Sequence, residues 1–254
     1  MRLLVWNDGA VIEASQFRLD KPYVMQRIHT LGHKAHNLAK HIELLRESSM
    51  SQFGFASLCG VLDAERIISK LLELSRVTHR LSCPVAMRIT SDGALSFEVE
   101  SPLYEAGMSL KARRFIGVEM PMLLTECSSQ SSVTVAIEAM GESMVTKRGG
   151  DIPIWVDETG NVVSLPWKPI FVVYKGRVYT PQEFHSVEYQ TVKEALTSLN
   201  IELAVCDFPF DSLLEVDEVF FVDVMATTSL FSIKQHRLLS VVTSRITSRM
   251  EPKI

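Results

Sequence analysis

The chain has 254 residues, of which 46% are hydrophobic and 22% are charged, and its net charge is -4 at pH 7. This length and composition suffice for a full globular core, organised as one large domain or as two of ordinary size. The basic residues are scattered along the sequence rather than clustered, so the charge pattern lacks the electrostatic footprint of a nucleic-acid-binding protein.

The cysteines and the apolar runs indicate the compartment. The N-terminal sequence MRLLVWNDG has neither a basic n-region nor an apolar h-region, and a membrane helix would need roughly 20 apolar residues in a row, far more than Val219 to Val222 provide. We therefore expect a soluble, cytoplasmic protein without membrane contact, in which the thiols are reduced and buried. The four cysteines are far apart and form no CxxC pair: Cys59, Cys83, Cys127 and Cys206.

Turn residues and periodicity predict an antiparallel sheet with two helices in the first half. Asp8-Gly9 supplies the positive φ angles of a tight turn, so the flanking segments form a hairpin. Apolar residues spaced by three and four predict one helix beginning near Leu38 and a second from about Asp63, its expected cap, to Thr78. The predicted strands are residues 3–6, 10–12 and 23–30, two that flank Ser91-Asp92-Gly93, and 110–115.

The pattern changes near Met120-Pro121, which places the predicted domain boundary between residues 119 and 120. The N-terminal α+β domain is then residues 1–119 and the C-terminal domain is residues 120–254. A serine-rich segment, CSSQSSVT, introduces a helix whose apolar residues lie four, three and four apart, at Val133, Ile137, Met140 and Met144. The remaining predicted elements are strands at residues 152–156, 161–163, 169–174, 201–205 and 219–222, and a helix at 187–199.

Two stretches of the second half carry a family resemblance. One runs from Gly160 to Pro181, GNVVSLPWKPIFVVYKGRVYTP, and the other from Leu213 to Met225, LLEVDEVFFVDVM. Both resemble the C-terminal domain of class IV aminotransferases, the group that holds branched-chain and D-amino-acid aminotransferases and 4-amino-4-deoxychorismate lyase. The matching scaffold residues are Gly160, Val162, Ile170, Phe171, Gly176, Thr180 and Pro181.

The resemblance implies an α+β, two-domain fold, the D-amino-acid aminotransferase-like pyridoxal 5'-phosphate (PLP) fold. In this fold a smaller N-terminal α/β sandwich precedes a larger, β-rich, barrel-like C-terminal domain. The similarity also covers His41 to Leu45 with Ser48, Gly107 to Arg114, and Val187 to Glu202. It further implies a homodimer.

The resemblance also indicates where cofactor chemistry would be placed. PLP needs a lysine for its Schiff base, donors for its phosphate and a carboxylate at its ring nitrogen. The family's residues for these tasks are replaced in this chain. The corresponding positions are Leu44 for a phosphate-binding arginine, Gln130 and Ser131 in the segment of the lysine, Ser164 for the glutamate, and Glu188 and Val224 for two phosphate-binding threonines.

Three functional readings stay open. The replaced anchors favour a catalytically degenerate protein, a pseudoenzyme without bound cofactor, that binds a ligand or serves as a partner subunit. The alternative is an active PLP-dependent aminotransferase or 4-amino-4-deoxychorismate lyase in which Lys168 is a relocated tether. A third reading is a small anionic metabolite held by Arg113 or Arg114 and by the amides of a helix start near Ser131. The sequence thus leaves open whether the protein is an enzyme.

The histidines of the first half are spaced like residues that share a helix face, which is one arrangement of metal ligands. No HExxH pattern or cysteine pair accompanies them. We therefore interpret them as structural residues and expect no metal. They are His29, His33, His36 and His41.

Overall fold

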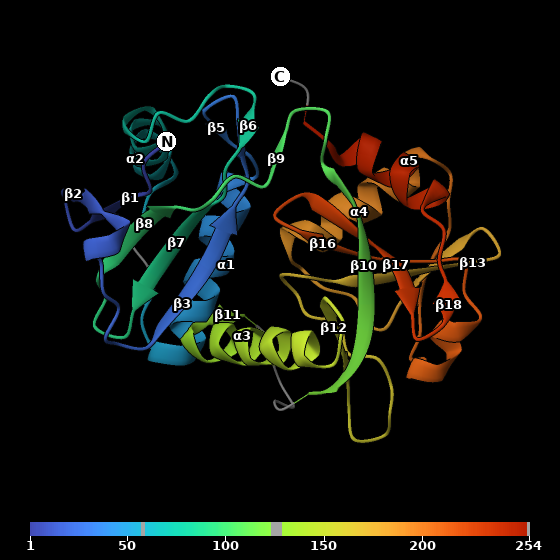
Figure 1. Cartoon of the computed structure of the whole chain (residues 1–254). Coiled ribbons are helices and arrows are strands. Elements are labelled where there is room, and N and C mark those ends of the chain that lie inside the picture. Colours follow the sequence, from blue (N-terminus) through green and yellow to red (C-terminus); the bar gives the residue numbers. More distant parts are fainter. Residues whose placement is uncertain (57–58, 123–128, 253–254) are drawn as a thin grey trace. The chain divides into compact units, whose positions relative to one another are not determined.

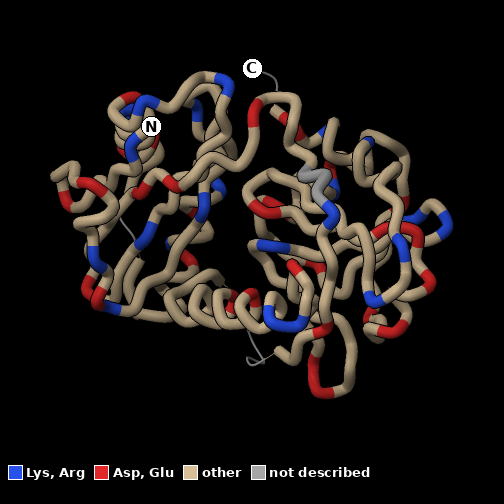
Figure 2. Tube along the Cα trace, in the orientation of Figure 1, with Lys and Arg blue, Asp and Glu red and all other residues tan. Residues whose placement is uncertain are grey.

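The computed structural model describes residues 1–56, 59–122 and 129–252, apart from the side chains of residues 111–113 (Figure 1). By internal contacts the chain divides into two compact units. Unit 1 comprises Met1–Met108, Ser128–Val133 and Pro252–Ile254, and unit 2 comprises Ser109–Cys127 and Thr134–Glu251. Within each unit, basic and acidic residues are interspersed (Figure 2).

Unit 1 is built on a six-stranded antiparallel sheet in the order β11-β3-β7-β8-β1-β2. The predicted hairpin at Asp8-Gly9 is confirmed as β1 and β2. The strands are β1 (Leu4–Asn7), β2 (Ala10–Glu13), β3 (Tyr23–Ile28), β7 (Val85–Thr90), β8 (Leu95–Val99) and β11 (Gln130–Ser131). Smaller elements are η1 (Ala14–Gln16), the pair β4 (Thr30–Leu31) and β5 (Lys34–Ala35), and the pair β6 (Leu81–Ser82) and β9 (Tyr104–Glu105).

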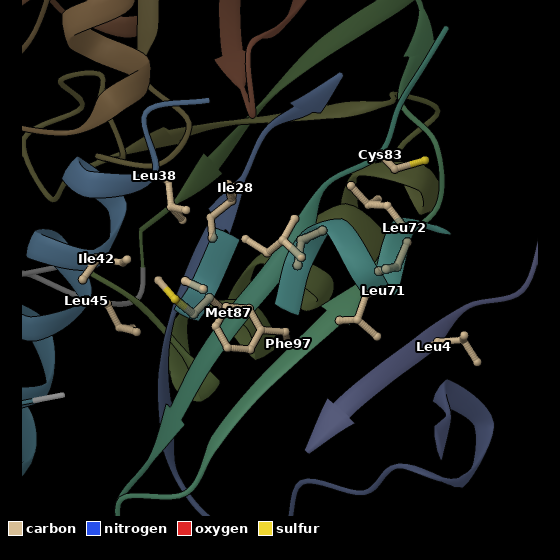
Figure 3. Close-up of a cluster of buried hydrophobic side chains, with 14 of the residues drawn as sticks. Leu4, Ile28, Leu38, Ile42, Leu45, Leu71, Leu72, Cys83, Met87 and Phe97 are labelled. Carbon is tan, nitrogen blue, oxygen red and sulfur yellow. The ribbon is translucent and has the colours of Figure 1, made fainter. Parts of the chain in front are cut away.

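Two helices, α1 (Leu38–Phe53) and α2 (Val61–Leu74), supply seven of the 17 buried residues of the unit 1 core. Their buried side chains meet those of the sheet, including Met87 and Phe97, which are fully buried (Figure 3). The expected cap of α2 is wrong: the helix begins at Val61 after Gly60, and Asp63 lies in its first turn. Glycine is an accepted cap residue, and an acidic residue in the first turn favours the helix dipole.

Unit 2 contains an eight-stranded sheet in the order β12-β10-β17-β16-β13-β14-β15, with β18 paired to β17. The predicted strand at residues 110–115 continues to Pro121. The strands are β10 (Leu110–Pro121), β12 (Ile152–Val156), β13 (Ile170–Tyr174), β14 (Arg177–Thr180), β15 (Leu203–Val205), β16 (Glu218–Asp223), β17 (Ala226–Ile233) and β18 (His236–Arg237). The segment expected as a strand at 161–163 makes only isolated bridges, at Asn161 and Val162.

Alternation along the central strands builds two cores in unit 2, one on each face of the sheet. Ile170 and Val172 of β13 face the short helix η2 (Phe210–Leu214). Phe171 and Val173 face the other side, which α4 (Val187–Ser198) and α5 (Val241–Met250) cover. The predicted buried strands are therefore buried on both faces.

Helix α5 begins against a carboxylate from the sheet. Its preceding residue, Ser240, makes no side-chain cap. Instead the buried Glu218 of β16 accepts hydrogen bonds from the Val242 and Thr243 amides, both at 2.8 Å, and from the Thr243 hydroxyl at 2.7 Å. Glu218 therefore caps the N-terminus of α5, although it belongs to a strand and not to the residue that precedes the helix.

The helix α3 (Ser132–Lys147) packs through small residues. A Cβ built on Gly141 would lie 2.3 Å from the Trp155 ring of β12, so only glycine permits this approach. The apolar stripe that predicts the helix is largely exposed instead: Val133 is 56% exposed, Met140 55% and Met144 39%.

Two further observations bear on the sequence-based expectations. The thiol of Cys83 is buried, but Cys206 is exposed, so the expectation of buried thiols is wrong there; Cys127 lies outside the described residues. Among the residues that the structure describes, we find no helix that is long and apolar enough to cross a membrane.

Candidate functional site

The positions implied by the resemblance fall into two groups. Leu44, Gln130 and Ser131 belong to unit 1, whereas Ser164, Glu188 and Val224 belong to unit 2.

In unit 2, Ser164 precedes β13 in the sequence and lies beside the first residue of that strand, Ile170. Its hydroxyl oxygen accepts a hydrogen bond from the Ile170 amide at 3.0 Å, and its side chain is buried. The neighbouring Pro169 carbonyl accepts the Val222 amide of β16 at 3.3 Å, and the Ile170 carbonyl accepts the Thr180 hydroxyl of β14 at 2.9 Å. Ser164 therefore lies where β13 starts and where β14 and β16 end.

The connection between β16 and β17 is at this same end of the sheet. Asp223 pairs with Ala226, and between them Val224 and Met225 adopt φ angles of 47° and 60°. Such two-residue turns normally contain glycine or asparagine. A β-branched valine at positive φ is an outlier that costs on the order of 1–2 kcal/mol. Strain of this kind concentrates at functional segments.

The first turn of α4 completes this group. Ser186 caps the helix by accepting the Tyr189 amide at 3.3 Å, and the Tyr189 ring lies 6.0 Å from that of Phe171 in β13. Glu188 is buried in this first turn, where a carboxylate interacts favourably with the helix dipole. The end of the sheet thus combines a helix N-terminus, a strained turn and the Ser164 hydroxyl.

Lys168 belongs to the turn between Ser164 and β13. Its amide donates to the Leu165 carbonyl at 3.1 Å, and its ammonium nitrogen lies 4.0 Å from a carboxylate oxygen of Glu142 on α3. The side chain is mostly buried, with 17% exposed. The described partner of this ammonium is therefore on α3 and not on β16, β17 or α4.

In unit 1, Leu44 is half-buried on α1, and its carbonyl accepts the Ser48 hydroxyl at 2.7 Å. Gln130 and Ser131 form β11, where they pair with Met25 and Val24 of β3. Both side chains are buried. Ser131 is therefore a strand residue, and α3 begins directly after it at Ser132, within the serine segment that is expected to open a helix.

The two arginines proposed as anion ligands lie in the irregular part of β10, where its register against β17 shifts between Lys111 and Ile116. The side chain of Arg113 lies outside the described residues. Arg114 is exposed, and its guanidinium carbon is 5.4 Å from the centre of the Phe231 ring. The same ring contacts Arg237 at 4.3 Å.

The histidines of unit 1 make structural contacts. His29 and the Tyr104 hydroxyl are 2.7 Å apart, and His41 lies 3.0 Å from the Gln26 side-chain oxygen. Burial lowers the pKa of His29 to about 3 and that of His41 to about 4, and it also lowers the pKa of His36. Within the described ranges, no group of three His, Cys, Asp or Glu residues is placed to hold a metal ion.

Sequence reasoning missed two features of unit 2. The cap of α5 by Glu218 depends on a contact between elements distant in sequence, which no local pattern reveals. The strained turn at Val224 was also missed, because valine and methionine are not turn residues. Its only signal was the position of the turn directly after a buried apolar strand.

The comparison with known proteins finds relatives through structure alone. No family model and no curated protein matches the sequence. A branched-chain aminotransferase from the archaeon Thermoproteus uzoniensis, solved with norvaline, is similar with a TM-score of 0.77 and 18% identity, over 98% of this chain and 94% of that one. A putative branched-chain amino acid aminotransferase from Thermotoga maritima gives 0.79 and 16%, over 98% and 95%.

A third solved structure, an aminotransferase from Brucella abortus bound to the cofactor PLP, has a TM-score of 0.77 and 12% identity, over 98% of each chain. The TM-scores and the coverage establish the fold, whereas identities this low leave the activity open. The chain therefore has the α+β fold of the class IV, PLP-dependent aminotransferases, as the sequence resemblance predicts.

Proposed function

We propose that this protein uses the class IV aminotransferase fold for binding and not for PLP chemistry. The observation that carries the proposal is the buried carboxylate of Glu188 in the first turn of α4. Amides at a helix N-terminus commonly bind phosphate. A carboxylate in the same turn repels a phosphate by on the order of a few kcal/mol at short range in a partly buried site.

The residues of this site do not fit PLP. The Ser164 hydroxyl accepts the Ile170 amide and is no carboxylate that could hold a pyridinium proton. Val224 has no side-chain donor for a phosphate. Lys168 is the only lysine in the described segments 164–170, 180–189 and 222–226, and its ammonium is directed to Glu142. We therefore assign no catalytic step to these groups.

The first test is incubation of the purified protein with PLP, followed by an absorbance spectrum, borohydride reduction and intact mass. We expect no internal-aldimine band and no reduced adduct at one per chain. A stoichiometric adduct on a single lysine would overturn the proposal.

The alternative, an active PLP enzyme, is supported by the similar fold of the PLP-bound aminotransferase and by the position of Lys168 in the turn that follows Ser164. It requires that Lys168→Ala abolish the adduct. The matched variant Lys147→Ala, which changes an exposed lysine of α3, must leave the adduct intact.

A second test concerns Glu188 itself. If its carboxylate excludes phosphate, Glu188→Gln raises the affinity for inorganic phosphate by about tenfold or more, since loss of the repulsion exceeds about 1.4 kcal/mol. The shift of melting temperature with phosphate concentration measures this change. The exposed Glu194 on the same helix provides the control variant Glu194→Gln. Equal phosphate responses of the two variants would contradict the assignment.

The partner of a binding protein with this fold is proposed to be a second copy of the chain. In unit 2, Met140 and Met144 lie one helical turn apart on α3, and both are exposed. Contiguous exposed apolar side chains mark interaction surfaces. We expect a dimer by light scattering that Met140→Glu weakens, whereas Thr146→Glu, at an exposed position of the same helix away from this stripe, leaves it unchanged. A monomeric wild type would refute this part.

A further inference from the structure

A pocket of about 640 Å³ lies in unit 2, at the end of the sheet away from the candidate site. The strands β12, β10 and β17 are parallel, so their carboxyl ends share one edge. Pro121 ends β10, Val156 ends β12 and Lys234 directly follows β17, and all three line the pocket. Crevices outside the carboxyl ends of parallel strands are common ligand sites in α/β sheets.

This pocket is separate from the positions that the family resemblance concerns. The Val224–Met225 turn precedes β17, whereas Lys234 follows it, and β17 has eight residues. At about 3.3 Å per residue, the two ends of the strand are roughly 25 Å apart. A ligand at one end cannot touch the other.

The wall of the pocket is mainly apolar. Val156 and the ring of Phe210 line it from one face of the sheet, and Ile116 and Val118 of β10 line it along the strand, with their side chains on the other face. Its volume is within the range of roughly 300–1,000 Å³ that is usual for small-molecule sites. The lining therefore suits a ligand with an apolar body.

Two cations stand at this apolar wall. Arg148 donates from one terminal nitrogen, Nη1, to the Glu119 carbonyl at 3.3 Å and contacts the Met120 sulfur at 3.5 Å. Its contacts in the described part of the chain use Nη1 alone, so Nε and Nη2 keep donors for a ligand. The Lys234 ammonium is 3.2 Å from Asp211 and 5.2 Å from the centre of the Phe210 ring.

The charges of the lining set the class of ligand. Arg148 and Lys234 are positive, and Glu119 is the one carboxylate among the described lining residues. Lys234 is already paired with Asp211, so Arg148, which keeps donors for a ligand, is the group that favours an acid. The Glu119 carboxylate disfavours a dianion by repulsion. The chemistry that matches is a single negative charge on an apolar molecule.

We propose that this pocket binds a small organic monoanion with an apolar body. The Arg148 guanidinium holds the acid group through two parallel hydrogen bonds, the geometry that planar acids and arginine share. The Lys234 ammonium adds a second contact, and the body packs on Phe210 and Val156. This site acts independently of the proposed function at the other end of the sheet.

The test uses the fluorescent monoanion 8-anilinonaphthalene-1-sulfonate as probe, with the wild-type chain. We expect saturable binding of one probe per chain, and displacement by phenylacetate but not by its neutral amide, phenylacetamide. Arg148→Gln should weaken probe binding by about tenfold, the size of a lost charge-assisted bond pair, and Lys234→Gln should weaken it less.

Matched controls separate a site from general surface charge. Arg245→Gln changes an exposed arginine of α5, and Lys193→Gln changes an exposed lysine that pairs with Glu183 as Lys234 pairs with Asp211. Both should bind the probe as the wild type does. Ile116→Trp adds bulk to the pocket lining and should abolish binding while the far-ultraviolet circular dichroism spectrum stays like that of the wild type.

Three results would overturn the proposal. They are no saturable binding to the wild type, equal binding by Arg148→Gln and Arg245→Gln, and equal displacement by phenylacetate and phenylacetamide. An effect of Glu188→Gln on the probe, without one of Arg148→Gln, would assign the probe to the other end of the sheet.

Discussion

At the scale of single residues, buried polar side chains determine which helix ends are stable. Glu218 satisfies two amides and one hydroxyl at the start of α5. Removing it leaves all three groups without their partner in a buried place, and each lost bond of this kind costs about 1 kcal/mol or more. The sequence could not assign this role, since glutamate in a strand is ordinarily a solvent-facing residue.

We expect Glu218→Ala to lower the free energy of unfolding by about 2–4 kcal/mol, whereas Glu218→Gln, which keeps an acceptor oxygen, costs less. Urea denaturation measures both values. Glu215→Ala, at an exposed position nearby, should stay within about 0.5 kcal/mol of the wild type. A Glu218→Ala variant as stable as that control would show that the cap contributes nothing.

At the scale of elements, the turn between β16 and β17 combines a stabilising effect, the packing of a buried side chain, with a destabilising one, backbone strain. Val224 is 1% exposed, so its methyl groups contribute to stability, yet its φ angle of 47° is unfavourable for any residue with a Cβ. Substitution by alanine loses the packing and keeps the strain. Substitution by glycine loses the packing and relieves the strain.

We therefore expect Val224→Gly to be more stable than Val224→Ala by about 1 kcal/mol. Val222, a fully buried residue within β16, provides the contrast. There the order reverses, because glycine in a regular strand is less stable than alanine by roughly 0.5–1 kcal/mol. Thermal unfolding of the four variants checks both orders, and the same order at both positions would argue against strain in the turn.

The contact of α3 with β12 gives a second prediction at this scale. Glycine to alanine within a helix normally stabilises it by about 0.5–1 kcal/mol. At Gly141 the added methyl would meet the Trp155 ring at 2.3 Å, so Gly141→Ala should destabilise the protein by about 1–3 kcal/mol. The double variant with Trp155→Phe should recover part of the loss. A stabilised single variant would disprove the close approach.

At the scale of the whole molecule, the two units differ in their response to acid. His29 and His41 have pKa values lowered by burial to about 3 and about 4, and both belong to unit 1. The unfolded chain protonates them near pH 6.5. Their stabilising contribution is thus complete above pH 6.5 and is lost as the pH falls toward 4, by up to about 1.4 kcal/mol per pH unit for each histidine.

We expect unit 1 to unfold before unit 2 when the pH is lowered from 7 to 4. Trp6 reports on unit 1, while Trp155 and Trp167 report on unit 2, so single-tryptophan variants separate the two transitions. His41→Gln should flatten the pH dependence of the Trp6 signal. His185→Gln, at an exposed site in unit 2, should not. Coincident transitions in all variants would count against the assignment.

Much of this architecture was predictable because its signals are local. The hairpin at Asp8-Gly9 and the buried strand at Ile170 follow from turn chemistry and from apolar runs. The resemblance also predicted the fold, since its scaffold residues, such as Gly160 and Gly176, lie at positive φ in turns. The roles of Leu44, Ser164 and Glu188 in binding stay predictions.

What could not be predicted depends on contacts between distant segments. The buried side of α3 is the side where Gly141 contacts Trp155 of a later strand. Helical periodicity within α3 cannot reveal this contact, and it selects the apolar stripe, which is largely exposed. The pocket at Arg148 and Lys234 arises only when three strands end together. The positions of Arg148 and Lys234 in the sequence do not indicate that the two residues line one pocket.

The pairing of β10 has a consequence for how the chain folds. Its partners on either side, β12 and β17, come later in the sequence, and Gly117 meets Ile233 only near the end of the chain. At a synthesis rate of about 5–20 residues per second, β10 waits on the order of ten seconds for its second neighbour. Contacts this distant in sequence close slowly because of loop entropy. A nascent chain therefore exposes both edges of β10 during this interval, and unpaired strand edges are the sites at which chains misassemble.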